Sequence, residues 1–155
     1  MVVALLRSPD PSPLVDLSRS LPVRAAVAFE AFADVVQTPR WFRGMVEAKV
    51  VFRDPSGRAT RVQFASDASP SPGEYTLDYR YNANDFAVTW ATDAASALFM
   101  RGEARFVPIS ATTSLMTYRL EKALAYPLGA LERSMQEEAD DVVAQFCAHL
   151  TRIRG

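Results

Sequence analysis

The sequence predicts an α+β protein in which a twisted, seven-stranded antiparallel sheet wraps around one long C-terminal helix. From Met45 to Glu121, runs of about ten residues alternate apolar and polar side chains between turn sequences, which is typical of an antiparallel meander. From Leu128 to Ile153 the chain has one amphipathic stripe, which at ~1.5 Å per residue spans roughly 39 Å. A protein of 155 residues accommodates such a helix if a sheet curls around it.

The N-terminal part divides into a leader and a first strand. Residues 1–13 are expected to form a flexible leader, because prolines there remove backbone donors and the neighbouring Ser and Asp favour turns. One domain is expected over residues 14–155. Val15 and Leu17 alternate with polar neighbours, which is the period of a half-buried strand.

Two short helices are predicted between the first strand and the meander. Pro22 suits the first turn of a helix, and Phe29, Phe32 and Val36 then fall on one side of an Ala-rich segment. Thr38-Pro39 interrupts this segment, since the residue before a proline disfavours helical geometry. Trp41 follows in a short connection and carries a large apolar surface.

The six strands of the meander each place one set of side chains on the buried face. That set is Val46/Ala48/Val50/Phe52, Val62/Phe64, Tyr75/Leu77/Tyr79/Tyr81, Phe86/Val88/Trp90, Leu98/Met100/Gly102/Ala104/Phe106 and Met116/Tyr118/Leu120. The opposite face carries charged residues such as Arg61, Asp78 and Arg119. One face of the sheet is therefore expected to be wet and the other buried.

Composition excludes several classes of function. The formal charge of −1 gives no field that would attract nucleic acid or an anionic membrane. Cys147 and His149 are the only residues of their types, so an internal disulfide and a zinc site built mainly from His and Cys are excluded. The apolar start at Met1 is too short for a membrane span, and the cytoplasm is the expected location. No cofactor is expected.

The order of elements and one N-terminal motif resemble a known superfamily. The motif P-x6-[FW]-x2-[LIF]-x-D-x4-P-x-W is matched by Pro22, Phe29, Phe32, Asp34, Pro39 and Trp41. It resembles the polyketide cyclase/dehydrase and coenzyme Q-binding branch of the Bet v 1-like (START-like, SRPBCC) superfamily, over about residues 15–153. The resemblance implies the helix-grip fold. Members include lipid carriers, quinone binders and aromatase/cyclases, so it does not assign a catalytic residue.

A ligand cavity of roughly 300–1,000 Å³ is predicted between the sheet and the last helix. The residues expected to line it are Trp41, Tyr79, Tyr81, Trp90, Met100, Gly102, Ala104, Tyr118, Met135 and Val142. Inward tyrosines point to a partly polar cavity, because a core that needs only filling favours aliphatic residues; alternatively the phenols reach the rim of the sheet. Small inward residues at 102 and 104 leave space, or else admit a close approach of the helix.

Other polar residues are interpreted structurally. The acidic run that contains Glu137, Glu138, Asp140 and Asp141 is expected on a solvated helix face rather than at a metal. His149 is expected at the border of the apolar stripe, near a helix end that favours a cation, as a structural or surface residue rather than a general base. Cys147 is expected to be an inert packed thiol on a different face of the helix.

Three classes of function remain open from the sequence. The leading one is a binding or carrier protein for a small hydrophobic ligand such as a lipid, a quinone or a polyketide. A polyketide cyclase or dehydratase and a toxin-like protein-interaction module are the alternatives, with a monomer or a dimer equally open. An inward-facing acid or arginine in the cavity favours the enzyme, whereas a filled core with an exposed apolar patch favours the interaction module.

Overall fold

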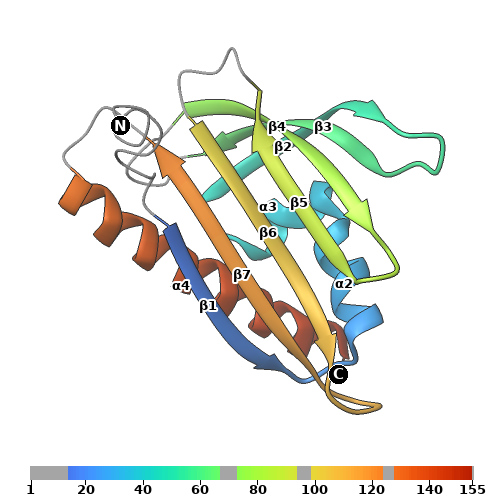
Figure 1. Cartoon of the computed structure of the whole chain (residues 1–155). Helices are drawn as coiled ribbons and strands as arrows, with labels where there is room; N and C mark the ends of the chain where they lie inside the picture. The colour runs from blue at the N-terminus through green and yellow to red at the C-terminus, as the bar shows by residue number, and fades with distance from the viewer. Residues whose placement is uncertain (1–13, 67–72, 94–98, 124–127, 155) are drawn as a thin grey trace, which may run out of the picture.

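The computed structural model describes residues 14–66, 73–93, 99–123 and 128–154 (Figure 1). The predicted leader, residues 1–13, lies outside the described residues. The elements follow in the order β1 (Leu14–Leu21), α2 (Ala25–Ala33), the 3-10 turn η1 (Val35–Gln37), α3 (Thr38–Trp41), β2 (Met45–Arg53), β3 (Ala59–Ser66), β4 (Gly73–Asn82), β5 (Ala87–Thr92), β6 (Phe99–Pro108), β7 (Ser114–Ala123) and α4 (Leu128–Arg154).

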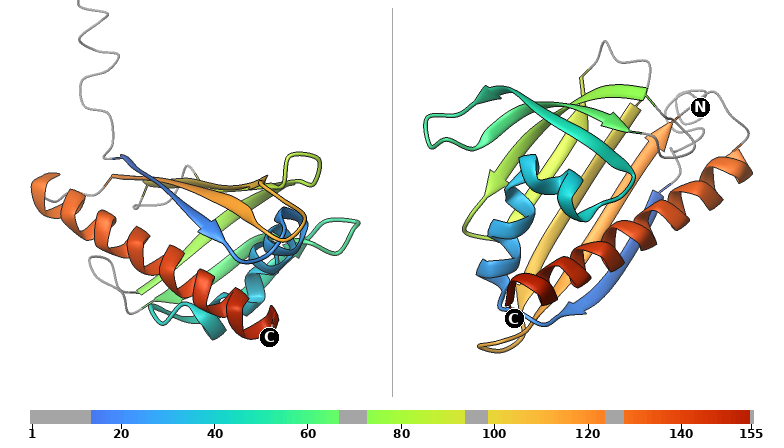
Figure 2. Two further views of the ribbon diagram at one scale, coloured as in Figure 1. Left: turned by 90° about the horizontal axis from the view of Figure 1, so that it is seen from below. Right: turned by 180° about the vertical axis from the view of Figure 1, so that it is seen from behind.

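One sheet of seven antiparallel strands forms the body of the protein, in the order β1-β7-β6-β5-β4-β3-β2. Strand β1 crosses to pair with β7, so the first and last strands of the chain lie side by side. Figure 2 shows α4 running across one face of this sheet along β1 and β7, with α2 and α3 on the same face. The predicted α+β fold is confirmed.

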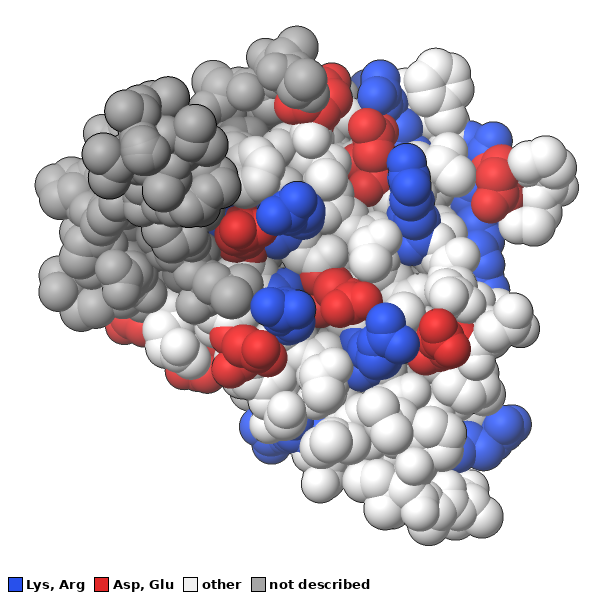
Figure 3. Space-filling view, in the orientation of Figure 1, with Lys and Arg blue, Asp and Glu red and all other residues white. Residues whose placement is uncertain are grey.

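The outer face of the sheet is covered by paired charges (Figure 3). Arg61 Nε lies 2.7 Å from Asp78 Oδ1 on the neighbouring strand, and Arg101 Nη2 lies 2.6 Å from Glu121 Oε1. Such exposed pairs contribute little stability each. Their charges make this face polar and solvent-exposed, as the alternating pattern predicts. The apolar side chains point to the opposite face, where the core lies.

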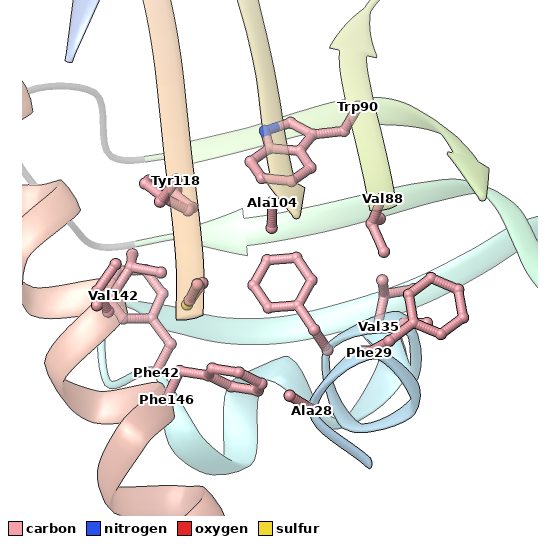
Figure 4. Packing of buried hydrophobic residues seen from close by; sticks show 14 of the residues in the cluster. Ala28, Phe29, Val35, Phe42, Val88, Trp90, Ala104, Tyr118, Val142 and Phe146 are labelled. Atoms are coloured by element: carbon pink, nitrogen blue, oxygen red, sulfur yellow. The ribbon is translucent and has the colours of Figure 1, made fainter. Parts of the chain in front are cut away.

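The core lies between the inner face and the helices (Figure 4). Phe146 of α4 is fully buried, with its ring centroid 5.2 Å from that of Phe32 and 5.1 Å from that of Trp41. The predicted core residues Phe29, Phe32, Trp41, Trp90, Phe106, Val142 and Phe146 are all buried. Leu98 and Met135 are also expected inward, but their side chains lie outside the described residues.

The segment after β1 departs from the prediction in three places. Helix α2 begins at Ala25, so Pro22 precedes the helix instead of occupying its first turn. Ser114 Oγ, at the start of β7, donates a hydrogen bond to the carbonyl of Val23 at 2.8 Å. This bond fixes the connection between β1 and α2. The helix ends at Ala33 and the chain resumes as η1, which changes the phase and buries Val35 rather than Val36. Trp41 ends a helical turn, α3, that has Pro39 near its start.

Strand β2 and the end of α4 also correct the predicted inner face. Val46 and Phe52 are exposed, because the pairing of β2 with β3 shifts register between Met45 and Glu47 and again between Val50 and Phe52. Each irregularity reverses the side to which later residues point. Ile153 is 53% exposed in the last turn of α4, so the buried stripe ends at Leu150.

Candidate functional site

An aromatic pocket opens between the inner face of the sheet, α3 and α4. We call it the inner pocket. Its walls are Phe32, Val35, Thr38, Trp41, Phe42, Met45, Tyr75, Leu77, Tyr79, Trp90, Met100, Tyr118, Leu120, Glu138 and Val142. Strands β2 and β4 to β7 and the helices α2, α3 and α4 therefore contribute to one site.

The inner pocket is much smaller than the sequence predicts. Its volume is about 60 Å³, against the 300–1,000 Å³ typical of pockets for small molecules. The expectation of a large preformed cavity is therefore wrong for this structure. Aromatic rings account for the difference: Trp90 lies 5.7 Å from both Phe32 and Tyr118 between ring centroids, and these rings fill the space under the sheet.

Six of the ten residues predicted to bind the ligand line the inner pocket, namely Trp41, Tyr79, Trp90, Met100, Tyr118 and Val142. Tyr81 does not: its hydroxyl donates to the carbonyl of Ala59 at 2.5 Å, away from the pocket. Tyr81 therefore lies at the rim of the sheet, which is the alternative to a cavity position that the sequence allows. Its partial burial raises the pKa of the phenol to about 12. Met135 lies outside the described side chains.

Gly102 and Ala104 do not leave open space. A Cβ atom at Gly102 would lie 2.4 Å from the indole ring of Trp90, so this ring, rather than the helix, occupies the room above the glycine. Ala104 is fully buried on the same strand, opposite Val88 of β5, and points into the core (Figure 4). Gly102 lets the Trp90 indole lie close against the sheet, and Ala104 belongs to the packed core. Neither residue is among those that line the inner pocket.

Replacement of Ala104 by phenylalanine is therefore expected to destabilise the fold. The new ring must displace Trp90 or its neighbours, and such overpacking costs typically ~1–3 kcal/mol or more. Urea unfolding followed by circular dichroism measures the loss. Thr89→Phe, on the adjoining strand at a partly exposed position, is the comparison. An Ala104→Phe protein as stable as the wild type would show that space is available there after all.

A buried ion pair borders the inner pocket, and the sequence interpretation missed it. Lys122 Nζ lies 2.5 Å from Glu138 Oε1. The side chain of Lys122 is 4% exposed and that of Glu138 is 16% exposed. Lys122 comes two residues after the inward Leu120, and Glu138 comes one turn before Val142. Lys122 therefore falls on the inward side of its strand and Glu138 on the inward side of its helix. This spacing is the sequence signal that could have predicted the pair.

The acidic run of α4 is thus only partly solvated. Glu137, Asp140 and Asp141 are exposed, as expected. Glu138 instead turns inward, because its position repeats the spacing of Val142 and Phe146 along the helix. In the described part of the chain, no group of acidic, His or Cys side chains is arranged to hold a metal ion.

Three phenols, those of Tyr75, Tyr79 and Tyr118, line the pocket. Burial raises the pKa of Tyr79 well above its usual value. Burial also raises the pKa of Tyr75 and Tyr118, and the Glu138 carboxylate adds to the shift in both. With a raised pKa these side chains are uncharged hydroxyl groups at neutral pH, a form that can donate a hydrogen bond.

An alkaline titration tests these shifts. The ordinary pKa of tyrosine is near 10, so above pH 10 the unfolded chain loses protons that the folded chain keeps. The free energy of unfolding is expected to fall as the pH rises above 10. Tyrosinate absorbance should follow the loss of the circular dichroism signal. Ionisation near pH 10 of more than one of the five tyrosines, in a chain that stays folded, would contradict the burial.

Trp41 joins the pocket to His149 of α4. Its ring is stacked on the imidazole with centroids 6.3 Å apart, and its buried Nε1 is the one such side-chain atom without a hydrogen-bond partner among the described residues. Burial, aided by Arg152, lowers the pKa of His149. The histidine therefore packs as a neutral ring, in line with its structural interpretation. Cys147 is half-buried nearby on the same helix.

No protein-family model matches this sequence, and no curated protein sequence matches it either. Within the described residues, no helix is long and apolar enough to cross a membrane.

Three solved structures show the same architecture at low sequence identity. A START superfamily protein from Mycobacterium smegmatis has a TM-score of 0.82 at 12% identity, over 90% of this chain and 98% of that one. The Zhui aromatase/cyclase from Streptomyces sp. R1128 has a TM-score of 0.79 at 12% identity, over 90% and 93%. A norcoclaurine synthase point mutant from Thalictrum has a TM-score of 0.69 at 7% identity, over 92% and 96%.

Proposed function

From the Bet v 1-like, START-like fold that these likenesses establish, we propose that the chain is a binding or carrier protein for a small hydrophobic ligand taken up in the inner pocket. Burial of the ligand's apolar surface supplies the affinity, at about 25 cal/mol per Å² before ordering costs. A lipid, a quinone or a polyketide-like molecule fits this description. Solved structures with this fold that are named START proteins and aromatase/cyclases support the proposal.

The observation that carries the proposal is that aromatic side chains and a buried ion pair meet at the inner pocket. Aromatic walls formed by Trp41, Trp90 and Tyr79 meet a carboxylate, Glu138, that is held by a buried lysine. Replacing a buried ion pair by apolar residues of the same volume often costs no stability. Its position at the pocket, rather than in the packed core, therefore favours a role toward a ligand. A few polar groups in an apolar pocket are typical of ligand sites.

Ligand entry requires the pocket to widen. A volume of about 60 Å³ accommodates only a few atoms, so wall residues must turn aside. Met45 and Met100 are suited to this, because the unbranched methionine side chain adopts several conformations at little cost. The proposal thus includes an adjustment of side chains on binding, while the strands keep their places.

The second candidate is an enzyme of the cyclase or dehydratase type. The inward-facing acid Glu138 favours it, since a carboxylate beside bound substrate could accept a proton while the neutral hydroxyls of Tyr75 or Tyr118 polarise a carbonyl group. Turnover of a poly-β-keto substrate that is lost with Glu138 would favour the enzyme over the carrier.

Binding to the inner pocket can be tested by nuclear magnetic resonance. The chain has two tryptophans, and both line the pocket, so their indole N–H signals report on it directly. With 2-methoxynaphthalene as the probe, both signals are expected to shift saturably. Val142→Phe should fill the pocket and abolish the shift in a folded protein, whereas Val142→Ala should enlarge the pocket and retain binding.

Opposite outcomes would contradict the proposal. Indole signals that do not move, or equal shifts in the Val142→Phe protein, would show that the probe does not occupy the inner pocket. Shifts confined to the exposed apolar residues Val46, Val51 and Phe52 of β2 would favour the protein-interaction alternative instead.

A further inference from the structure

The ion pair leaves one acceptor available at the inner pocket. Lys122 Nζ donates to Oε1 of Glu138, and among the described residues no hydrogen bond reaches the other carboxylate oxygen, Oε2. Glu138 lines the pocket, whereas Lys122 lies behind it on β7. A molecule in the pocket therefore meets a carboxylate whose position is fixed by the lysine.

The charge of the pair selects the kind of group that can bind there. An ammonium group would place a second positive charge beside Lys122, so it gains little. An anionic group would face the carboxylate of Glu138 and be repelled. A neutral donor avoids both costs, because its hydrogen bond to an ionised acceptor is stronger than one between neutral groups.

The walls select the rest of the molecule. Trp41 and Trp90 face the same space as Glu138, together with Tyr79. Aromatic side chains favour stacked or edge contacts with another flat ring. The polar end of the pocket also holds the hydroxyl groups of Tyr75 and Tyr118, which remain protonated and offer further hydrogen bonds.

We infer that the inner pocket selects neutral aromatic hydroxyl compounds, with the ligand's hydroxyl group donating to Glu138 and its ring against the aromatic walls that include Trp41 and Trp90. This inference rests on the proposed binding function and names the ligand class for it. Lys122 acts as a positioning residue, since it holds the carboxylate without lining the pocket.

Isothermal titration calorimetry on the wild-type protein at pH 7 provides the first test. The probes are 2-naphthol and 2-methoxynaphthalene, which share a ring system and differ in the hydroxyl donor. The donor is expected to give at least about tenfold tighter binding, since a hydrogen bond to a charged group exceeds the ~1.4 kcal/mol that corresponds to tenfold. Naphthalene-2-carboxylate and (naphthalen-2-yl)methylammonium should both bind more weakly than 2-naphthol.

A double variant identifies the acceptor. Lys122→Met with Glu138→Leu removes both charges together and keeps the volume, so that no charge is left unpaired. This protein should bind the two neutral probes with equal affinity. Glu137→Gln, which changes the exposed neighbour on α4, should keep the wild-type preference.

The outcomes separate this inference from the proposed function. If neither neutral probe binds to the wild type, the binding function itself fails. If both bind with equal affinity, or if the double variant keeps the preference, the pocket binds aromatic molecules but Glu138 does not recognise a hydroxyl group. Tighter binding of the ammonium or the carboxylate probe would overturn the choice of a neutral donor.

Discussion

Replacement of Phe146 by alanine is expected to lower the free energy of unfolding by about 3–5 kcal/mol, the usual cost of removing a buried phenylalanine ring. The ring is fully buried, and it contacts Phe32, Trp41 and Phe106 at centroid distances of 5.2, 5.1 and 6.0 Å. It therefore joins α4 to α2, α3 and β6 at one point. Urea unfolding monitored by circular dichroism gives the value.

Ile153→Ala provides the matched control on the same helix. Ile153 is 53% exposed, so its truncation should change stability by no more than about 0.5 kcal/mol. Equal losses for the two variants would contradict the observed end of the buried stripe. A loss below about 1 kcal/mol for Phe146→Ala would show that α4 is not packed against the sheet through this ring.

Much of the fold could be predicted because each strand repeats a simple pattern over many residues. On β6, Met100, Ala104 and Phe106 keep the inward phase from one end of the strand to the other, and the pairing with β7 runs without a register shift. Strand β2 could not be predicted as well. Its register shifts depend on pairing with β3, so no local pattern reveals that Val46 and Phe52 face solvent.

The candidate site was only partly predictable for a different reason. Which residues face inward follows from period and phase, and on that basis six of the ten predicted residues reach the pocket. How much space remains depends on side-chain conformation. Trp90 lies over Gly102 and so fills room that a small residue seemed to leave. Only the packed structure shows this, and it reduces the predicted cavity to about 60 Å³.

The ion pair could have been predicted from the sequence. Lys122 keeps the inward phase of Tyr118 and Leu120, and Glu138 keeps the phase of Val142 and Phe146. Grouping Glu138 with its acidic neighbours concealed this spacing. A charged residue at a buried phase of one element predicts an opposite charge at a buried phase of the element that faces it, because an unpaired buried charge is costly.

A double-mutant cycle on Lys122 and Glu138 is expected to show very different stability losses for the two single variants. Glu138→Leu leaves the lysine charge, which is 4% exposed, without a partner, and this should cost about 3–5 kcal/mol of stability. Lys122→Met leaves the carboxylate of Glu138 without a partner, but this side chain is 16% exposed and has better access to water. The stability loss of Lys122→Met should therefore be smaller. The double variant should be about as stable as the wild type or more so, since apolar pairs replace buried ion pairs without loss.

Urea unfolding of the four proteins at pH 7 yields the coupling energy between the two residues. A favourable coupling with the double variant near the wild type would show that the fold does not need the pair. Stability alone would then not account for the pair, and its place beside the pocket would support a role toward a ligand. If the double variant is instead as unstable as Glu138→Leu, the two side chains hold α4 to β7, and their role is structural. That result would remove the main support for Glu138 as the group that meets a ligand.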